Sequence, residues 1–144
     1  MQTTISELMA EEHKKINNTL EQFEQSEIKD YEESKKLFSI FKWNLDKHFF
    51  IEEKVIFHIY NISSEEEDFD IINLLKDHKD ILWLISKMEE SLKSNLKPSV
   101  IELKKLLLAH SKIEDKTFYP RLDKELSVEE KALIIGRFDE VIGE

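Results

Sequence analysis

The sequence contains no cysteine, and it has only two glycines and two prolines among its 144 residues. The absence of cysteine excludes disulfide bonds, thiolate metal sites and cysteine nucleophiles. It is compatible with a reducing compartment, and we therefore expect a cytoplasmic protein. Because glycine and proline interrupt helices and form turns, their scarcity favours long helices with short connections.

The sequence also lacks a long hydrophobic run and an excess of positive charge. No stretch of about 18 apolar residues is present, so no segment is predicted to span a membrane. The beginning, MQTTISELMAEEHKK, has no basic start followed by an apolar block and is not expected to be a signal peptide. The net charge of −10 disfavours nucleic acids and anionic lipids as partners. The densest acidic run, SSEEEDFD at 63–70, is interpreted as a solvated connection, with a metal-attracting loop as the alternative.

The apolar pattern that remains predicts four long helices and a shorter fifth one. Apolar residues recur every three or four positions in the ranges 4–25, 31–60, 68–94 and 98–119. Pro98 suits the first turn of the fourth helix, and Pro120 is expected to end it. A fifth helix is expected after Ser127, which forms a capping box with Glu130.

These ranges predict an all-α fold. Four helices of about 20 to 30 residues with short links favour an antiparallel up-down-up-down four-helix bundle. The length suits a single domain over residues 1–144. The short C-terminal fifth helix is expected to pack across one end of the bundle, and no internal repeat is apparent.

Polar side chains interrupt the apolar stripe of every long helix. Each stripe has a histidine where an apolar residue is expected, and two of these histidines are followed four residues later by a glutamate. Residues three or four apart share a helix face, so these side chains are predicted to point into the core. At 1.5 Å per residue, the distances from the connections place them within about one helical turn of a common level. They are His13, His48, Glu52, His78, His110 and Glu114.

A layer of buried polar groups requires compensation. A buried unpaired carboxylate costs several kcal/mol, and a set of unpaired groups would rival the stability of a whole domain, about 5–15 kcal/mol. Metal ions provide this compensation, because neutral imidazoles and ionised carboxylates are their ligands. One zinc ion would use four ligands, so this larger set suits two ions, with the carboxylates bridging them. Nitrogen and oxygen ligands without sulfur fit iron or manganese, although zinc or copper could bind in vitro.

The order of these residues resembles the hemerythrin-like, or HHE cation-binding, family. The resemblance rests on His13, on HFFIE at 48–52, on His78 and on HSKIE at 110–114, and it covers all four long helices. It implies a non-haem di-iron site inside a four-helix bundle, with two iron ions and a bridging oxo or hydroxo group. Carried over, it assigns His13 and His48 to one iron ion. His78 and His110 would bind the other, and the two glutamates would bridge the pair.

The sequence departs from the oxygen-carrying hemerythrins. Those proteins have His-x-x-x-His on the third helix, whereas leucines occupy the positions four residues either side of His78. They also use an aspartate five residues after the last histidine, a position that Asp115 occupies here. Helix geometry favours Glu114, because a residue at plus four is rotated about 40° from His110 and one at plus five about 140°. Replacement of Glu114 by Asp115 stays an open alternative.

The pattern of four histidines and two glutamates is more similar to the di-iron proteins of iron–sulfur cluster repair and nitric oxide stress. The resemblance implies a protein that binds or senses oxygen or nitric oxide, or protects against them. The alternatives are a di-iron redox enzyme that turns over peroxide or nitric oxide, an iron donor for cluster repair, and an interaction module that the metal only stabilises. An electron-transfer or iron-accepting protein is a further expected partner. Two histidines per iron leave a coordination position free, which favours reactivity over oxygen carriage.

Other polar residues near these motifs are expected to lie outside the ligand set. His58 is about 80° off the polar stripe and about 15 Å further along, so we expect it to be peripheral. Glu53 is expected to be solvated, although it is a fallback for Glu52. No sequence feature assigns a role to Tyr60 or Tyr119.

Several aromatic and amide or hydroxyl residues have two interpretations. The aromatic residues are interpreted as bundle core, with a dry pocket for a diatomic gas as the alternative. They are Phe49, Trp43, Trp83 and Phe118. Asn17 and Thr117 fall on the inward faces and fit either hydrogen-bonding partners of ligands or polar residues at a helix edge.

Overall fold

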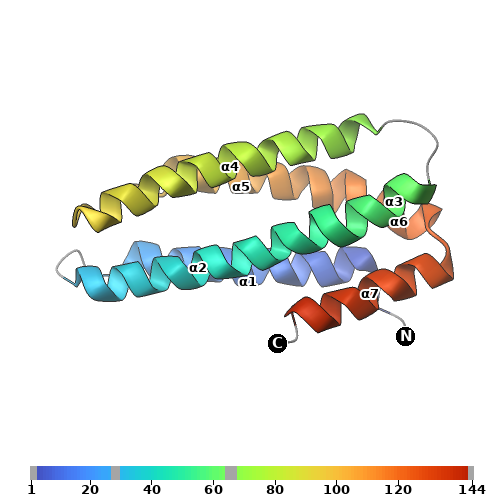
Figure 1. The fold of residues 1–144 in the computed structure, drawn as a ribbon, viewed down its shortest axis with the longest axis horizontal. Helices are drawn as coiled ribbons and strands as arrows, with labels where there is room; N and C mark the ends of the chain where they lie inside the picture. The colour runs from blue at the N-terminus through green and yellow to red at the C-terminus, as the bar shows by residue number, and fades with distance from the viewer. Residues whose placement is uncertain (1–2, 27–29, 64–67, 143–144) are drawn as a thin grey trace.

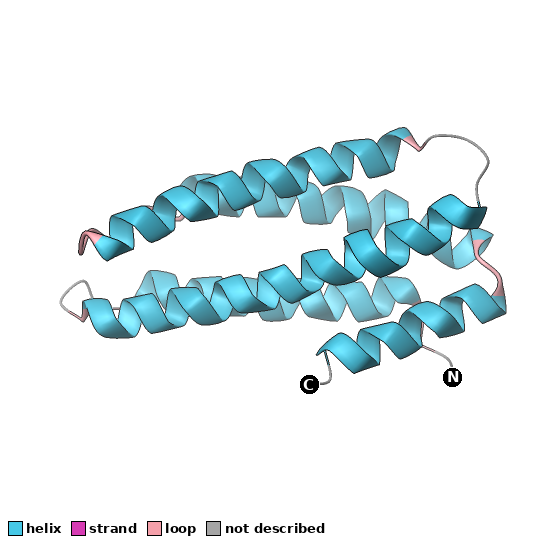
Figure 2. Cartoon of the chain, in the orientation of Figure 1, coloured by secondary structure: helices cyan, strands magenta, loops and turns pink. Residues whose placement is uncertain are grey.

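The computed structural model describes residues 3–26, 30–63 and 68–142. Within these ranges the chain is helical apart from short links and contains no strand (Figure 2). None of the described helices is long and apolar enough to cross a bilayer. The elements are α1 (Ile5–Gln25), α2 (Tyr31–Ile51), η1 (Glu52–Ile56), α3 (Phe57–Ser63), α4 (Phe69–Lys93), α5 (Ile101–Ile113), η2 (Glu114–Phe118), α6 (Tyr119–Glu125) and α7 (Val128–Ile142), where η is a π-helical turn.

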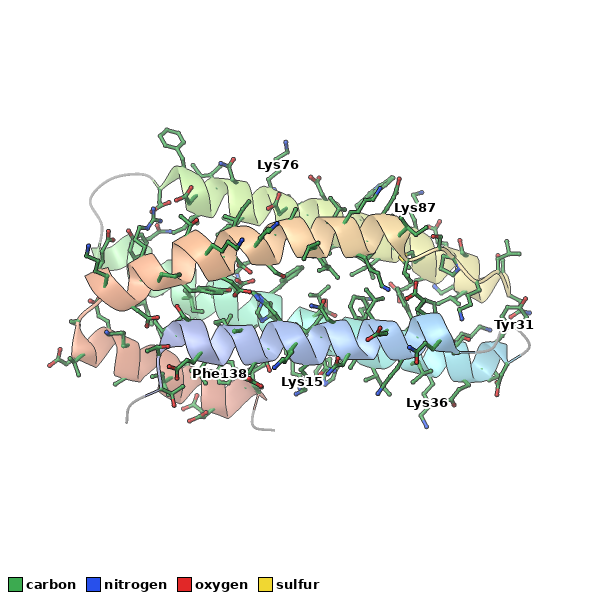
Figure 3. All side chains as sticks on the ribbon, turned by 180° about the vertical axis from the view of Figure 1, so that it is seen from behind. Lys15, Tyr31, Lys36, Lys76, Lys87 and Phe138 are labelled. Carbon is green, nitrogen blue, oxygen red and sulfur yellow. The ribbon has the colours of Figure 1, made fainter. Side chains whose placement is uncertain are left out.

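The elements form an antiparallel four-helix bundle with a fifth helix, as predicted. α1 packs along α2, α4 packs along α5, and further contacts join α2 to α4 and α1 to α6 (Figure 1). α2, η1 and α3 form one continuous helical segment, and α5, η2 and α6 form another. Side chains fill the space between the helices, while Lys36, Lys76 and Lys87 point away from the bundle (Figure 3).

Short polar side chains begin the helices by accepting hydrogen bonds from the free N–H groups of the first turn. Thr4 caps α1, Asp30 caps α2 and Asp68 caps α4. The predicted capping box before α7 is present. The Glu130 N–H donates to Ser127 Oγ at 3.1 Å, and the Ser127 N–H donates to Glu130 Oε1 at 2.9 Å.

Both expectations about proline were wrong. The helix continues through Pro120 to Glu125, because the preceding turn is a wide π turn in which the Tyr119 N–H bonds to the carbonyl of Glu114. Pro120 then occupies the first turn of α6, where its missing N–H is tolerated. Pro98 lies in the link before α5, and Val100 is the N-cap residue of that helix.

The fifth helix does not pack across the end of the bundle. α7 runs along its side and contacts α2 and η1 (Figure 1). Ile134 and Phe138 on its inner face join the same apolar cluster as Val55 and Ile56 of η1. The apolar outer side of η1 is therefore covered by α7, which explains why the helix lies there.

The acidic run at 63–70 lies partly outside the described residues, since 64–67 are not described. Of its described acidic residues, Asp68 and Asp70 each accept a hydrogen bond from Arg121, both at 2.8 Å. These two hydrogen bonds connect the start of α4 to α6.

A polar layer divides the core into two apolar clusters. On α1, Met9 belongs to the first cluster, Ile16 belongs to the second, and His13 lies between them. On the three other long helical segments, polar residues likewise lie between the two clusters, and the order along the chain is reversed on the two segments that run antiparallel to α1. The polar layer is therefore enclosed by hydrophobic side chains along the bundle axis.

Candidate metal centre

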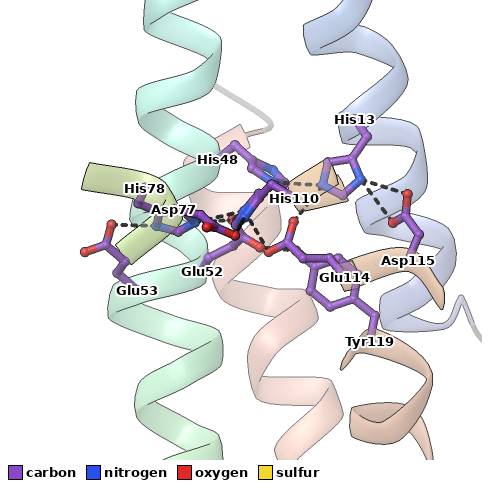
Figure 4. A network of polar contacts seen from close by, with 10 residues as sticks. All are labelled: His13, His48, Glu52, Glu53, Asp77, His78, His110, Glu114, Asp115 and Tyr119. Carbon is purple, nitrogen blue, oxygen red and sulfur yellow. Dashed lines mark hydrogen bonds and ion pairs between the residues drawn. The ribbon is translucent and has the colours of Figure 1, made fainter. Parts of the chain in front are cut away.

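The six polar residues that interrupt the apolar stripes come together in this layer (Figure 4). Each histidine is at most 8% exposed, and both glutamates are fully buried. Each long helical segment supplies at least one of them. They are His13 on α1, His48 and Glu52 on α2 and η1, His78 on α4, and His110 and Glu114 on α5 and η2.

Contacts between these side chains close into a ring. Every histidine points its Nε2 into the ring, and each glutamate lies between two histidines. The contacts are Glu114 Oε1 to His13 Nε2 (3.1 Å), His13 Nε2 to His48 Nε2 (3.2 Å), His48 Nε2 to Glu52 Oε1 (3.3 Å), Glu52 Oε1 to His78 Nε2 (3.1 Å), His78 Nε2 to His110 Nε2 (3.2 Å) and His110 Nε2 to Glu114 Oε2 (3.3 Å).

Protons alone cannot satisfy this ring. Each Nε2 has a single hydrogen-bonding position, either a proton or a lone pair, but takes part in two contacts of the ring. The four imidazoles can therefore make hydrogen bonds in at most four of the six contacts, whether or not a carboxyl group is protonated. Any contact without a proton brings two lone pairs together at hydrogen-bond distance, which is costly in a buried site. Cations at the centre would accept all of these lone pairs at once. Imidazole and carboxylate donors therefore fit metal ions here, and they fit iron, manganese or zinc by ligand type.

Two groups of donor atoms are compact enough to hold an ion, with their atoms within 4.8 Å of one another. One group contains Glu52, His78, His110 and Glu114, and the other contains His13, His48 and Glu114. The pairs of histidines match the pairs that the sequence resemblance assigns to separate ions. Their role as metal ligands stays a prediction.

Three further carboxylates lie behind the histidines, in a role that the sequence interpretation did not give them. Each accepts a hydrogen bond from an Nδ1–H and so directs the Nε2 of that imidazole at the centre. The pairs are His13 with Asp115 at 3.0 Å, His78 with Glu53 at 2.9 Å and His110 with Asp77 at 3.1 Å. Each carboxylate is adjacent in sequence to a ring residue, which is the signal that could have revealed it.

Glu53 and Asp115 correct two earlier interpretations. Glu53 was expected to be solvated, and its side chain is 34% exposed, but it also binds His78 on the side opposite Glu52. Asp115 was the alternative to Glu114, but it binds the outer nitrogen of His13, while Glu114 contacts the inner nitrogen. Consecutive carboxylates thus hold both nitrogens of one imidazole.

The π turns begin at the two ring glutamates. The Phe57 N–H bonds to the carbonyl of Glu52, and the Tyr119 N–H bonds to the carbonyl of Glu114, one residue further along than in an α-helix. Such turns occur frequently at functional sites. Here the wide turn accompanies the placement of two consecutive carboxylates around one histidine.

Tyr119 is a further partner that the sequence interpretation missed. It is fully buried, and its hydroxyl donates a hydrogen bond to Glu52 Oε2. It follows Glu114 by one π turn on the inner side of the segment. Burial, together with the charges of Glu114 and Glu52, raises the pKa of Tyr119 well above its usual value.

The environment within the ring shifts the pKa values of its members in different directions. Burial disfavours a charged His13 or His110, but hydrogen bonds with carboxylates outweigh it, so the pKa of His13 rises to about 10 and that of His110 to about 11. Burial instead lowers the pKa of His48 to about 3. Burial and the nearby Glu52 raise the pKa of Glu114 to about 7. For Glu52, burial is outweighed by the histidines, and its pKa is held well below its usual value.

Aromatic side chains pack against the layer only in part as expected. Phe49 stacks on the His78 ring with centroids 3.8 Å apart, and Phe118 is buried beside Tyr119. The interpretation of the tryptophans as core was wrong, because Trp43 is 63% exposed and Trp83 is 64% exposed. Both rings lie outside the core, and each has one lysine ammonium group 5.6 Å from its centroid, that of Lys47 at Trp43 and that of Lys87 at Trp83.

The remaining polar candidates lie at the surface. His58 is exposed and outside the ring, as expected. Asn17 and Thr117 are also exposed and are polar residues at a helix edge, not partners of the ring residues. Asn17 borders a narrow cavity between α1 and α5 that reaches His13, His48 and His110.

Comparisons with known proteins agree with the geometry. Residues 4–122 match the hemerythrin HHE cation binding domain, a span that contains the whole ring and its partner carboxylates. No curated protein and no solved structure shows significant similarity to the chain. With most of its length matched and a buried cluster of histidines and glutamates at its centre, the chain belongs to the hemerythrin HHE cation-binding domain family and is a metal-binding, hemerythrin-like protein.

Proposed function

We propose that the chain holds two iron ions in the ring and that this iron pair interacts with oxygen or nitric oxide, in binding, sensing or stress protection. The observation that carries the proposal is the closed ring of six polar contacts, which protons cannot satisfy together. A ring of this size exceeds the four ligands of a single tetrahedral ion and suits two ions.

The positions of the glutamates support a shared pair of ions. Glu52 Oε1 contacts His48 at 3.3 Å and His78 at 3.1 Å, so it lies between the two histidine pairs. Glu114 spans the pairs with its two oxygens, Oε1 to His13 at 3.1 Å and Oε2 to His110 at 3.3 Å. We therefore infer that both glutamates bridge the ions. His13 and His48 would hold one ion, and the other two histidines the second.

The surrounding residues would orient and protect this site. The carboxylates behind His13, His78 and His110 keep the Nε2 lone pairs directed at the centre. Tyr119 holds Glu52 through a hydrogen bond. The apolar clusters on either side exclude bulk water. When bound, an iron pair with a bridging oxo or hydroxo group supplies reversible redox chemistry and a coordination position for a diatomic molecule.

One experiment tests the proposal. The protein is loaded with ferrous iron without oxygen, oxygen or nitric oxide is added, and the near-ultraviolet and visible spectrum is followed. We expect two iron ions per chain and an adduct that forms and reverses. A folded protein that binds no iron under reducing conditions would disprove the proposal.

The same experiment separates the alternative functions. Irreversible oxidation with turnover of added peroxide or nitric oxide would indicate a redox enzyme. Transfer of iron to an acceptor protein would indicate a donor for iron–sulfur cluster repair. Two histidines for each ion, rather than three for one of them, favour these reactive alternatives over oxygen carriage. An effect of iron on the melting temperature alone would indicate a structural role.

A further inference from the structure

The first half of the bundle (α1 to α3) and the second half (α4 to α6) have the same pattern of polar residues, although their apolar residues show no repeat. Each half has an acidic residue before its first histidine, EH at 12–13 and DH at 77–78. Each then has a histidine, a glutamate four residues later and another acidic residue, HFFIEE at 48–53 and HSKIED at 110–115. The expectation that the sequence contains no repeat was therefore wrong for its polar residues.

Three of the four acidic positions in this pattern are used in matching ways. The residue after each ring glutamate binds a histidine of the other half: Glu53 binds His78, and Asp115 binds His13. The residue before the first histidine of the second half, Asp77, binds His110. The equivalent position in the first half is residue 12, and the equivalent histidine is His48.

His48 lacks the carboxylate that the other ring histidines have. Its Nδ1 is buried and has no hydrogen-bond partner within the described residues. The whole residue is only 2% exposed, so this nitrogen is shielded from bulk solvent. A buried donor or acceptor without a partner is costly, which makes this nitrogen a feature to be explained.

Glu12 is a buried residue with no assigned role. It is 6% exposed, and within the described part of the chain its carboxylate forms no hydrogen bond or ion pair. The positive charges near it are Lys15 on its own helix and Lys47 on α2. α1 packs along α2, and Glu12 is among the buried residues of α1. Its counterpart in the second half, Asp77, binds His110, so the pattern indicates the unpartnered Nδ1 of His48 as the matching partner of Glu12.

The position of the proton on the His48 imidazole explains why Glu12 and the Nδ1 of His48 form no hydrogen bond without metal. The Nε2 of His48 lies 3.3 Å from Glu52 Oε1, so a proton on Nε2 is held by this carboxylate. Nδ1 then carries a lone pair, which repels a carboxylate. A cation at Nε2 requires that nitrogen to be unprotonated, so the neutral imidazole carries its proton on Nδ1 instead. Nδ1–H then needs an acceptor.

We propose that Glu12 is the positioning residue of His48 and accepts a hydrogen bond from its Nδ1–H when a cation occupies Nε2. The proposal rests on the proposed function, since it requires a metal ion at His48. Glu12 has one more methylene than Asp77 and can therefore change its reach by rotation about its side-chain bonds. Metal binding would thus complete a set of four carboxylate–histidine pairs.

Zinc is the probe for the test, because it suits these ligands and is diamagnetic. Wild-type protein, Glu12→Gln and the control Glu11→Gln are compared, since Glu11 is the exposed neighbour on α1. Long-range proton–nitrogen NMR of the histidine rings reports the position and hydrogen bonding of each ring proton. With zinc, we expect a protected Nδ1–H on His48 in wild type and in Glu11→Gln. In Glu12→Gln this signal should shift or exchange away, while the other histidines keep theirs.

Zinc affinity provides the second measurement. Loss of such a partner typically lowers metal affinity about 10- to 100-fold, and we expect this in Glu12→Gln, with a smaller loss in Glu12→Asp. Circular dichroism establishes that each variant is folded. If Glu12→Gln matches Glu11→Gln in both the His48 ring proton and the zinc affinity, the proposed pair is refuted while the metal site stands. If wild-type protein binds neither zinc nor iron, the proposed function itself fails.

Discussion

At the scale of single residues, the chemistry of the centre depends on which nitrogen of each imidazole is available to a cation. In three of the ring histidines, a carboxylate occupies Nδ1, and Nε2 faces the ring. The inward positions could be predicted, because three- and four-residue spacing is a local property of a helix. The histidine that each outer carboxylate binds could not be predicted, because Glu53, Asp77 and Asp115 act on histidines of other helices.

Removal of a ring residue should lower the iron content. Glu52→Ala removes a carboxylate that contacts histidines of both pairs, and His110→Ala removes one imidazole, so both variants should retain well below two iron ions per chain. Iron bound after anaerobic loading and desalting measures this. His58→Ala is the control, since His58 is exposed and outside the ring, and it should bind as much iron as wild type. Equal iron loss in all three variants would contradict the ligand assignment.

Metal uptake should release protons and weaken in acid. At neutral pH the metal-free site holds extra protons, because the pKa of His13 is about 10, that of His110 is about 11 and that of Glu114 is about 7. Each proton displaced makes the affinity fall about tenfold per unit decrease in pH. Two displaced protons would therefore give about a hundredfold change. Calorimetric titration with zinc in buffers of different ionisation enthalpy counts the protons, and a count of zero would contradict the prediction.

The same pKa values determine how the metal-free protein responds to alkali. A histidine with a raised pKa stabilises the folded state fully below its ordinary pKa of 6.5, and this contribution is lost as the pH rises through its folded value. For His13 and His110 the loss falls between pH 6.5 and about 11. Metal-free protein should thus lose stability over this range, and metal-loaded protein should lose less, because the cation replaces the protons.

At the scale of helical elements, the main difference from the sequence expectation is the pair of π turns. Apolar periodicity predicted the long segments but placed a helix end at Pro120, whereas the chain passes through η2 into α6. A π turn adds one residue without changing the residue types on either side, so the spacing of apolar residues contains no clear signal for it. The position of α7 is likewise a tertiary feature, because α7 packs on a surface formed jointly by α2 and η1.

Deletion of Lys116, an exposed residue within η2, tests the role of the wide turn. Removing one residue should convert the turn to α-helix and keep the phase of both flanks, with a loss of about 1–3 kcal/mol in the free energy of unfolding. Asp115 should lose its place behind His13, so metal affinity should fall. Circular dichroism and zinc titration measure the two effects.

Deletion of Lys105, which is exposed in the regular helix α5, is the matched control. It rotates the following residues by about 100° and takes His110 off the inner face, so the bundle should unfold or lose all metal binding. If deletion of Lys116 is as damaging as deletion of Lys105, the π turn is not the adaptable element that we describe.

At the scale of the whole molecule, a polar layer between two apolar clusters couples metal binding to folding. The ring exists only when all four long segments are assembled, so a cation binds the folded chain and not the unfolded one. The family match ends at residue 122, before α7, and contains every ring residue. The single-domain organisation over residues 1–144 stays a prediction.

Metal removal should therefore lower the melting temperature. Free metal at one hundred times its dissociation constant stabilises the folded state by about 2.7 kcal/mol, which for a chain of this size corresponds to about 10 °C. Thermal unfolding followed by circular dichroism, with and without a chelator, measures the difference. Glu52→Ala should show little of this shift, whereas His58→Ala should show all of it. A wild-type protein that binds metal without a change in melting temperature would contradict the coupling.

The amino-acid sequence by itself determined the helical class, the antiparallel bundle and the inward position of the histidines and glutamates. All of these depend on the periodicity of one helix and on the lengths of the links. Only the tertiary structure decided which carboxylate lies behind which histidine, that Tyr119 holds Glu52, that two turns are wide and that the tryptophans are exposed. These features depend on the rotation and axial shift of one helix against another, and a pattern within a single helix does not contain that information.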